Sequence, residues 1–345
     1  MKTFKCGACG NTVYFENIQC LRCGHPLGFH PDRLEMRALV EADDGLYLEY
    51  KKGSGSAVRY CANTEQGVCN WLVDDDSSAQ FCVACELNRT IPNLADPANV
   101  FAWGEFERAK KRLVYSLLRL GLPLDGGAVG KAPLNFDFVN DALTGHLDGV
   151  ITIAVGEADS VERERQRKAM AETYRSLLGH LRHESGHYYW MLLIDGTGNI
   201  EPFRALFGDE REHYGAALER HHSHGPPAEW TQRHVSAYAS AHPWEDWAET
   251  WAHYLHMLDA LDTSAVHRVE PAFGRFGAGI WPLRPLDVYR IESFDALIRR
   301  WVPLTIALNE INRSIGHADF YPFVLPELAV TKLAFVHRVI RDAMQ

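Results

Sequence analysis

The segment H-E-S-G-H contains the residue types that a hydrolytic zinc site requires. His183, Glu184 and His187 form an H-E-x-x-H motif, and on a helix the two histidines lie one turn apart on the same face. Both imidazoles can then bind one zinc ion, while Glu184 can reach a water on the metal and take its proton as the water attacks a carbonyl. Because the chain has 17 histidines, the alternative is a chance match on a helix whose histidines only pack. A third metal ligand elsewhere in the chain would favour the zinc site over the chance match.

An acidic helix further along the chain supplies that ligand. Pro243 suits the first turn of a helix, and Glu245 and Glu249 are four residues apart, so they share one face. We expect Glu245 to complete a His/His/Glu zinc site of the gluzincin type, and Glu249 to bind the outer nitrogen of a zinc-binding histidine. The swapped assignment remains open. Asp246 is expected only to complement the helix dipole.

Two C-x-x-C pairs near the N-terminus predict a structural zinc site. Each pair forms a tight turn that directs two thiolates at one point, and two such turns give a tetrahedral four-thiolate site. So short a segment could hardly fold without the metal. The ligands expected in this zinc ribbon are Cys6, Cys9, Cys20 and Cys23.

The remaining cysteines predict a second structural zinc site, although their first pair is spaced more widely than a C-x-x-C. In the simpler interpretation both modules are purely structural. In the alternative they recruit a protein partner. The ligands expected in the second site are Cys61, Cys69, Cys82 and Cys85.

Amphipathic segments after Pro97 must position the histidine and glutamate side chains. The apolar spacing between Phe106 and Leu120 predicts a helix, and the residues Gly149–Val155 read as a strand. That strand either lies at a sheet edge and holds an extended substrate by backbone pairing, or is an ordinary core strand. A charged helix over Val161–Glu172 and a second helical segment over Thr173–Leu193, which carries H-E-x-x-H, are expected to follow.

Composition narrows the class of protein. The chain has 345 residues, 46% of them hydrophobic and 23% charged, as in a globular protein. The formal net charge of -10 argues against a nonspecific nucleic-acid binder. No apolar run is long enough to span a bilayer and the N-terminus has no apolar signal core, so we expect a cytoplasmic protein without membrane contact. In that compartment eight cysteines favour metal binding over disulfides.

The stretch E-D-W-A-E-T-W-A-H-Y-L-H resembles the glutamate helix of the gluzincin catalytic domain of anthrax lethal factor. The resemblance implies that Glu245 binds zinc and that Tyr238, seven residues before it, supports the oxyanion by donating a hydrogen bond. Ordinary packing is the alternative for Tyr238. Nearly the whole chain is also similar to a bacterial family of zinc-binding metallopeptidases with an N-terminal zinc ribbon. That similarity rests on the paired cysteine turns, on C-N-W-L-V, on Y-R-S-L-L-G-H-L-R-H-E-S-G-H-Y-Y-W and on P-W-E-D-W-A-E-T-W-A-H-Y-L-H.

The expected fold is α+β and predominantly helical. A zinc ribbon at residues 1–30 and a second four-cysteine module at residues 31–95 precede a zincin-like, gluzincin-type metallopeptidase domain at residues 96–345, which ends in a helical C-terminal subdomain. The expected cofactors are one catalytic and two structural zinc ions.

The expected function is zinc-dependent hydrolysis of peptide bonds in a peptide or protein substrate, with Glu184 as general base. The alternative is a zinc-ribbon adaptor that binds protein or nucleic acid and carries a metallopeptidase-like domain that does not cleave. An intact Glu184 favours the enzyme, because a scaffold that only binds metal would not need this carboxylate. In a third interpretation, the protein binds the catalytic zinc but hydrolyses an amide that is not a peptide.

Overall fold

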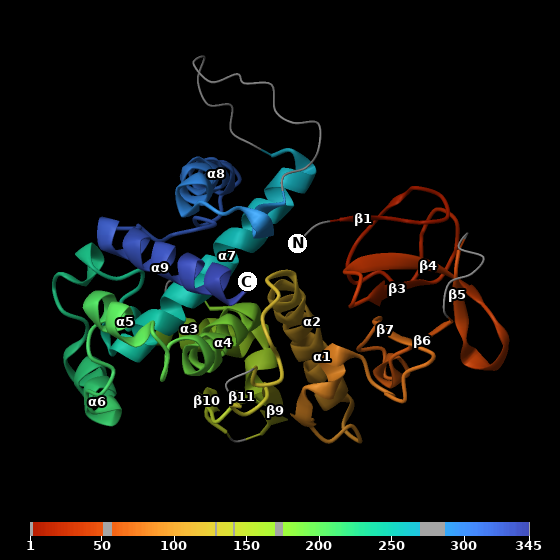
Figure 1. Cartoon of the computed structure of the whole chain (residues 1–345), viewed down its shortest axis with the longest axis horizontal. Coiled ribbons are helices and arrows are strands. Elements are labelled where there is room, and N and C mark those ends of the chain that lie inside the picture. The colour runs from red at the N-terminus through yellow and green to blue at the C-terminus, as the bar shows by residue number, and fades with distance from the viewer. Residues whose placement is uncertain are drawn as a thin grey trace, which may run out of the picture. The chain divides into compact units, whose positions relative to one another are not determined.

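The computed structural model describes residues 3–50, 57–127, 130–140, 142–169, 175–269 and 287–344, and the chain divides into two compact units (Figure 1). Unit 1 contains the cysteine-rich segment and the first long helix, and unit 2 contains the H-E-x-x-H helix. Unit 1 comprises Met1–Arg119, Asn135–Gly145 and Val150–Arg163, and unit 2 comprises Leu120–Leu134, His146–Gly149 and Glu164–Gln345.

Unit 1 begins with small antiparallel sheets, drawn in red and orange in Figure 1. Two strands form the first, and five strands paired in chain order form the second. Gly10 and Gly24 follow the two cysteine pairs with φ of 73° and 74°, left-handed backbone that glycine adopts without strain. The strands are β1 (Phe4–Lys5), β2 (Thr12–Val13), β3 (Leu27–His30), β4 (Glu35–Glu41), β5 (Tyr47–Glu49), β6 (Val58–Tyr60) and β7 (Leu72–Asp74).

An aromatic core joins the zinc ribbon to the long helix α2 (Pro97–Arg119). The ring of Phe29 lies 4.8 Å from those of Phe15 and Trp71, and Tyr115 of α2 lies 5.4 Å from Phe15. All four side chains are at most 5% exposed. Such ring pairs are stabilising beyond the area they bury, so α2 and the cysteine modules share one hydrophobic core.

The rest of unit 1 contains helix α2 and most of a mixed sheet. The helix ends before Gly121, whose φ of 62° is the left-handed conformation common just after a helix. The sheet has the order β10-β11-β9-β8, in which β9 pairs parallel with both β8 and β11. These elements are α1 (Val83–Glu86), β8 (Asn88–Thr90), β9 (Asn135–Val139), β10 (Gly145–Leu147) and β11 (Val150–Ala154).

The edge-strand interpretation of Gly149–Val155 is wrong. Strand β11 lies between β10 and β9, so both of its backbone edges are already paired. Its Ile151 and Ile153 are fully buried, as in an ordinary core strand. In the described part of the chain, β10 and β8 are the outer strands of this sheet.

Unit 2 is mainly helical, and its principal contact is the packing of α4 (Leu177–Leu193) along α7 (Pro243–His267). The H-E-x-x-H helix and the glutamate helix are therefore neighbours, as the sequence required. The predicted start of α4 at Thr173 lies outside the described residues. The other helices are α3 (Ser160–Ala169), which spans the two units, α5 (Ile200–Phe207), α6 (Tyr214–His224), α8 (Phe294–Ser314) and α9 (Glu327–Ala343).

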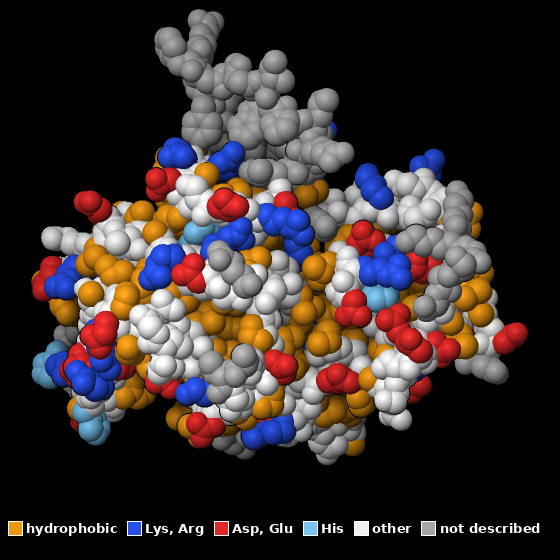
Figure 2. Space-filling view, viewed as in Figure 1, with side chains coloured by type: hydrophobic (Ala, Val, Ile, Leu, Met, Phe, Trp, Pro, Cys, Tyr) orange, Lys and Arg blue, Asp and Glu red, His pale blue; other side chains and the backbone are white. Residues whose placement is uncertain are grey.

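Within the described ranges, no helix is both long and apolar enough to cross a bilayer. Positive and negative side chains are interspersed over the face shown in Figure 2.

Candidate metal centres

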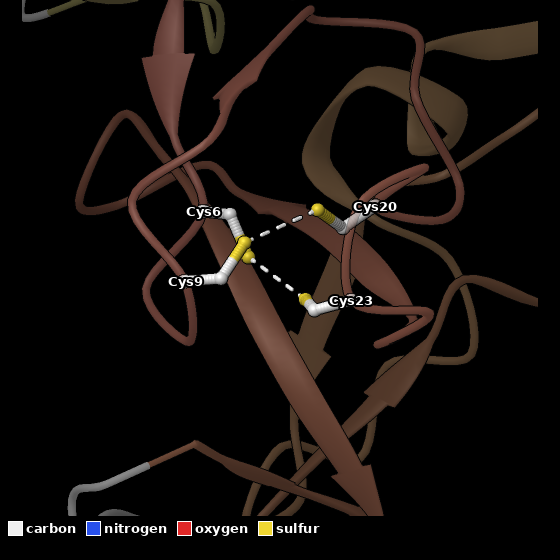
Figure 3. Close-up of side chains that lie close together, drawn as sticks. All are labelled: Cys6, Cys9, Cys20 and Cys23. Carbon is white, nitrogen blue, oxygen red and sulfur yellow. Dashed lines mark hydrogen bonds between the residues drawn. The ribbon is translucent and has the colours of Figure 1, made fainter.

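The first four cysteines converge on one point, as Figure 3 shows. The Sγ atoms of Cys6 and Cys23 are 3.7 Å apart, and so are those of Cys9 and Cys20. Zinc–sulfur bonds of about 2.3 Å in a tetrahedron place the sulfurs about 3.8 Å apart, so this quartet fits zinc. A hydrogen bond from the Cys23 backbone lowers the pKa of the Cys20 thiol to about 6. A backbone hydrogen bond at His25 would lower the pKa of Cys23 too, but burial and the neighbouring thiols raise it to about 12.

The second cysteine quartet fits zinc equally well and is fully buried. Cys69 Sγ lies 3.8 Å from Cys82 Sγ and 3.7 Å from Cys85 Sγ. Two side chains of α2 flank it. Glu107 Oε2 lies 3.6 Å from Cys85 Sγ, and the Lys111 ammonium donates a hydrogen bond to the backbone carbonyl of Val68, next to Cys69.

Helices α4 and α7, which carry the H-E-x-x-H motif and the two glutamates, approach each other unusually closely. Gly186 lies inside the H-E-x-x-H motif, and a Cβ added to it would lie 2.8 Å from Ala248 Cα and 3.2 Å from Trp251 Cβ. Trp247 Nε1 donates to the Gly186 carbonyl at 2.8 Å, and Trp251 Nε1 donates to Ser185 Oγ at 3.1 Å. The two helices can therefore meet at this separation only because residue 186 is glycine.

A Gly186→Ala substitution is expected to force the helices apart and to lower the free energy of unfolding by about 1–3 kcal/mol, the usual cost of overpacking. Because Glu245 moves with α7, a metal ion bound between the two helices would also be held more weakly. Urea unfolding and zinc analysis measure the two effects. Gly104→Ala on α2 is the control, since its new Cβ would make only an ordinary 3.6 Å contact. An unchanged unfolding midpoint for Gly186→Ala would contradict this account.

His183, His187 and Glu245 form a cluster whose candidate ligand atoms all lie within 4.8 Å of one another. Glu245 Oε2 is 3.0 Å from His183 Nε2, and Glu245 Oε1 is 3.4 Å from His187 Nε2. The His187 ring is packed 3.9 Å from that of Trp244. Two imidazole nitrogens and one carboxylate facing one point are the donor set of a zinc site with an open position.

Glu249 contacts the outer nitrogen of the first histidine. Its Oε1 lies 2.7 Å from His183 Nδ1, and its Oε2 accepts a 2.6 Å hydrogen bond from Ser236 Oγ. This arrangement holds the imidazole so that Nε2 faces His187 and Glu245. The structure thus places Glu245 beside both histidines and Glu249 behind one of them, the arrangement expected if Glu245 is the ligand.

The electrostatics of the cluster suit a cation. Burial alone would lower the pKa of His183, but the carboxylates of Glu245 and Glu249 beside it raise that pKa well above its ordinary value. Burial alone would raise the pKa of Glu245, but His187 and His183 hold it well below its ordinary value. The two carboxylates stabilise positive charge in this buried site, which is compatible with a zinc ion.

Two tyrosines border this cluster together with Glu184. The ring of Tyr238 lies 5.9 Å from that of His183. Tyr214 Oη donates a 2.7 Å hydrogen bond to Glu245 Oε1. Burial, followed by the negative charge of Glu245, raises the pKa of both phenols far above the ordinary value, and Glu184 contributes to both shifts. Both phenols therefore stay protonated and can donate hydrogen bonds.

Sequence reasoning missed Tyr214 and Ser236 and underestimated Asp246. No spacing rule connects Tyr214 or Ser236 with the glutamates they contact. Asp246 does occupy the first turn of α7, yet it is also buried, with an Oδ2 that lies 2.5 Å from Lys332 Nζ and 3.1 Å from His234 Nδ1. These partners come from distant segments that only the folded chain brings together.

Comparisons with known proteins match both the cysteine-rich N-terminal segment and the segment that follows it. A family model described as "Putative zinc-binding metallo-peptidase" matches residues 99–339, and one described as "zinc-ribbon domain" matches residues 3–96. An uncharacterized protein of Mycobacterium bovis is 41% identical over 348 residues, which cover 99% of this chain and 96% of the relative. Uncharacterized proteins of two Mycobacterium tuberculosis strains match to the same extent. No solved structure matches the chain at a significant level.

Proposed function

Because the chain belongs to the family described as "Putative zinc-binding metallo-peptidase", we propose that it hydrolyses peptide bonds of a peptide or protein substrate. The observation that carries the proposal is the convergence of His183, His187 and Glu245 beside Glu184. Zinc in this cluster would supply Lewis acidity toward the substrate carbonyl. The two cysteine quartets would hold structural zinc ions, which gives three ions for the chain.

The chain's own residues would provide the proton transfers and orientation. The Glu184 carboxylate takes a proton from the attacking water and delivers it to the nitrogen of the leaving amine. The Tyr238 phenol donates a hydrogen bond to the oxygen on which negative charge develops. Glu249 keeps the His183 ring in its orientation, because it binds Nδ1 at 2.7 Å.

Metal analysis of single variants tests the ligand assignment. Wild type is expected to contain about three zinc ions per chain, and His183→Ala and Glu245→Ala about two. Glu249→Ala should still bind the third ion, but about 10–100-fold more weakly, since it removes an orienting contact rather than a ligand. If instead Glu249→Ala loses the ion and Glu245→Ala keeps it, the swapped assignment is correct. Two ions in wild type and no change in His183→Ala would contradict the catalytic site.

We also propose that the zinc ribbon contacts a protein partner. Near its cysteine turns it exposes apolar side chains: Tyr14 is 57% exposed, Ile18 66% and Leu21 93%. These three side chains lie close together in the sequence, and an apolar surface patch is commonly used in protein contacts. Such contacts would direct the peptidase to its substrate and would not require nucleic-acid binding.

A further inference from the structure

Tyr214 reaches the metal cluster from a helix that contributes no candidate ligand. It is the first residue of α6, which His213 caps by accepting a 3.1 Å hydrogen bond from the Ala216 backbone. The Tyr214 ring packs 5.2 Å from that of His242 and 5.6 Å from that of Trp244, the residues that begin the glutamate helix. These contacts hold the phenol at the start of α7, next to Glu245.

The phenol makes the two oxygens of Glu245 different from each other. Oε1 accepts the 2.7 Å hydrogen bond from Tyr214. Oε2 is buried and lies at ion-pair distance, 3.0 Å, from His183 Nε2, and no hydroxyl donates a hydrogen bond to it in the described part of the chain. A carboxylate oxygen that accepts a strong hydrogen bond has less electron density to offer a metal ion. Oε2 is therefore the better ligand atom.

We propose that Tyr214 is a positioning residue that makes Glu245 bind the metal through Oε2 alone. The inference rests on the proposed function, because it presupposes a metal ion between His183, His187 and Glu245. If both carboxylate oxygens bound the ion, they would occupy the position that a water or a substrate carbonyl needs. The hydrogen bond from Tyr214 thus keeps the site open for catalysis, while the Tyr238 phenol neighbours Tyr214 and its ring lies 5.9 Å from that of His183.

The test compares Tyr214→Phe with Tyr238→Phe in the full chain and uses metal binding as its readout. The third zinc is defined as the ion that wild type holds and His183→Ala lacks. Its affinity is measured by competition with a chelator. Tyr214→Phe is expected to lower this affinity about 10-fold, as loss of a ligand-orienting contact usually does, and Tyr238→Phe to leave it unchanged.

Cobalt in place of the third zinc reports the coordination number. Four-coordinate Co²⁺ absorbs visible light more strongly than five-coordinate Co²⁺, so Tyr214→Phe should weaken the absorption if Glu245 then binds through both oxygens. Tyr238→Phe should keep the wild-type spectrum. Thermal unfolding confirms that both variants are folded.

The possible results distinguish a failure of the role of Tyr214 from a failure of the proposed function. A wild-type protein that binds no His183-dependent metal overturns both. Three bound ions, with wild-type affinity and cobalt spectrum in Tyr214→Phe, overturn only the role of Tyr214. Equal losses in Tyr214→Phe and Tyr238→Phe also overturn it, because the effect would then come from any phenol near the cluster.

Discussion

A Glu184→Gln variant is expected to lose about 10²–10⁴-fold of its peptide-cleaving activity and to keep all of its zinc. Glutamine has nearly the shape of glutamate, but its amide cannot take a proton from water. The Glu184 side chain is 8% exposed and raises the pKa of the neighbouring Tyr214 and Tyr238 phenols. The substitution therefore removes the general base with little change in the shape of the cluster.

A proteome-derived peptide library measures this effect without knowledge of the substrate. Cleavage products are compared between wild type and Glu184→Gln, with Glu201→Gln as the control, because Glu201 is an exposed glutamate on α5. Equal cleavage by Glu184→Gln and wild type would contradict the proposed mechanism. If wild type cleaves no peptide and releases no fragment of itself, the non-cleaving adaptor becomes the better interpretation.

Loss of one ligand of the second cysteine quartet is expected to unfold much of the segment from β6 to β8. A structural zinc site contributes about 10–16 kcal/mol to the folding of small zinc-binding peptides, and serine does not replace a thiolate ligand. Cys82 is 2% exposed, so a Cys82→Ser change leaves a polar hydroxyl in a dry interior. Part of α2 should loosen with the segment, because Glu107 lies beside Cys85.

Hydrogen exchange with peptide-level resolution measures this loss. Amide protection should fall over residues 58–90 and in α2, while α4 and α7 keep theirs. The protein should also hold about one zinc ion fewer than wild type. Ser78→Ala, an exposed change in the same segment, is the control. Full protection in Cys82→Ser would mean that the second quartet does not support the fold.

Local patterns in the sequence predicted the parts of the site that depend on short-range geometry. Helical spacing placed His183 and His187 on one face, and the C-x-x-C turns placed two thiolates at one point. The family resemblance is confirmed by the matching family models. The likeness to anthrax lethal factor and the role of Tyr238 remain predictions, and so do the domain boundaries at residues 30 and 95.

Long-range contacts explain what the sequence did not reveal. The neighbours of β11 in the sheet depend on where β10 pairs, and nothing in the residues Gly149–Val155 specifies that partner. One partner of Asp246 is Lys332, 86 positions away on α9. Tyr214 meets Glu245 only because α6 packs at the start of α7. In each case tertiary packing, rather than local propensity, determines the outcome.

The aromatic core of unit 1 limits how this zinc ribbon could be exchanged between proteins during evolution. Tyr115 of α2 packs among rings supplied by the ribbon, so a recombination point near residue 96 would separate partners of a single core. A peptidase that acquired or lost the ribbon at that point would expose the apolar face of its first helix to water. We therefore expect inheritance of the ribbon together with α2, and compensating changes at residue 115 in any relative that lacks it.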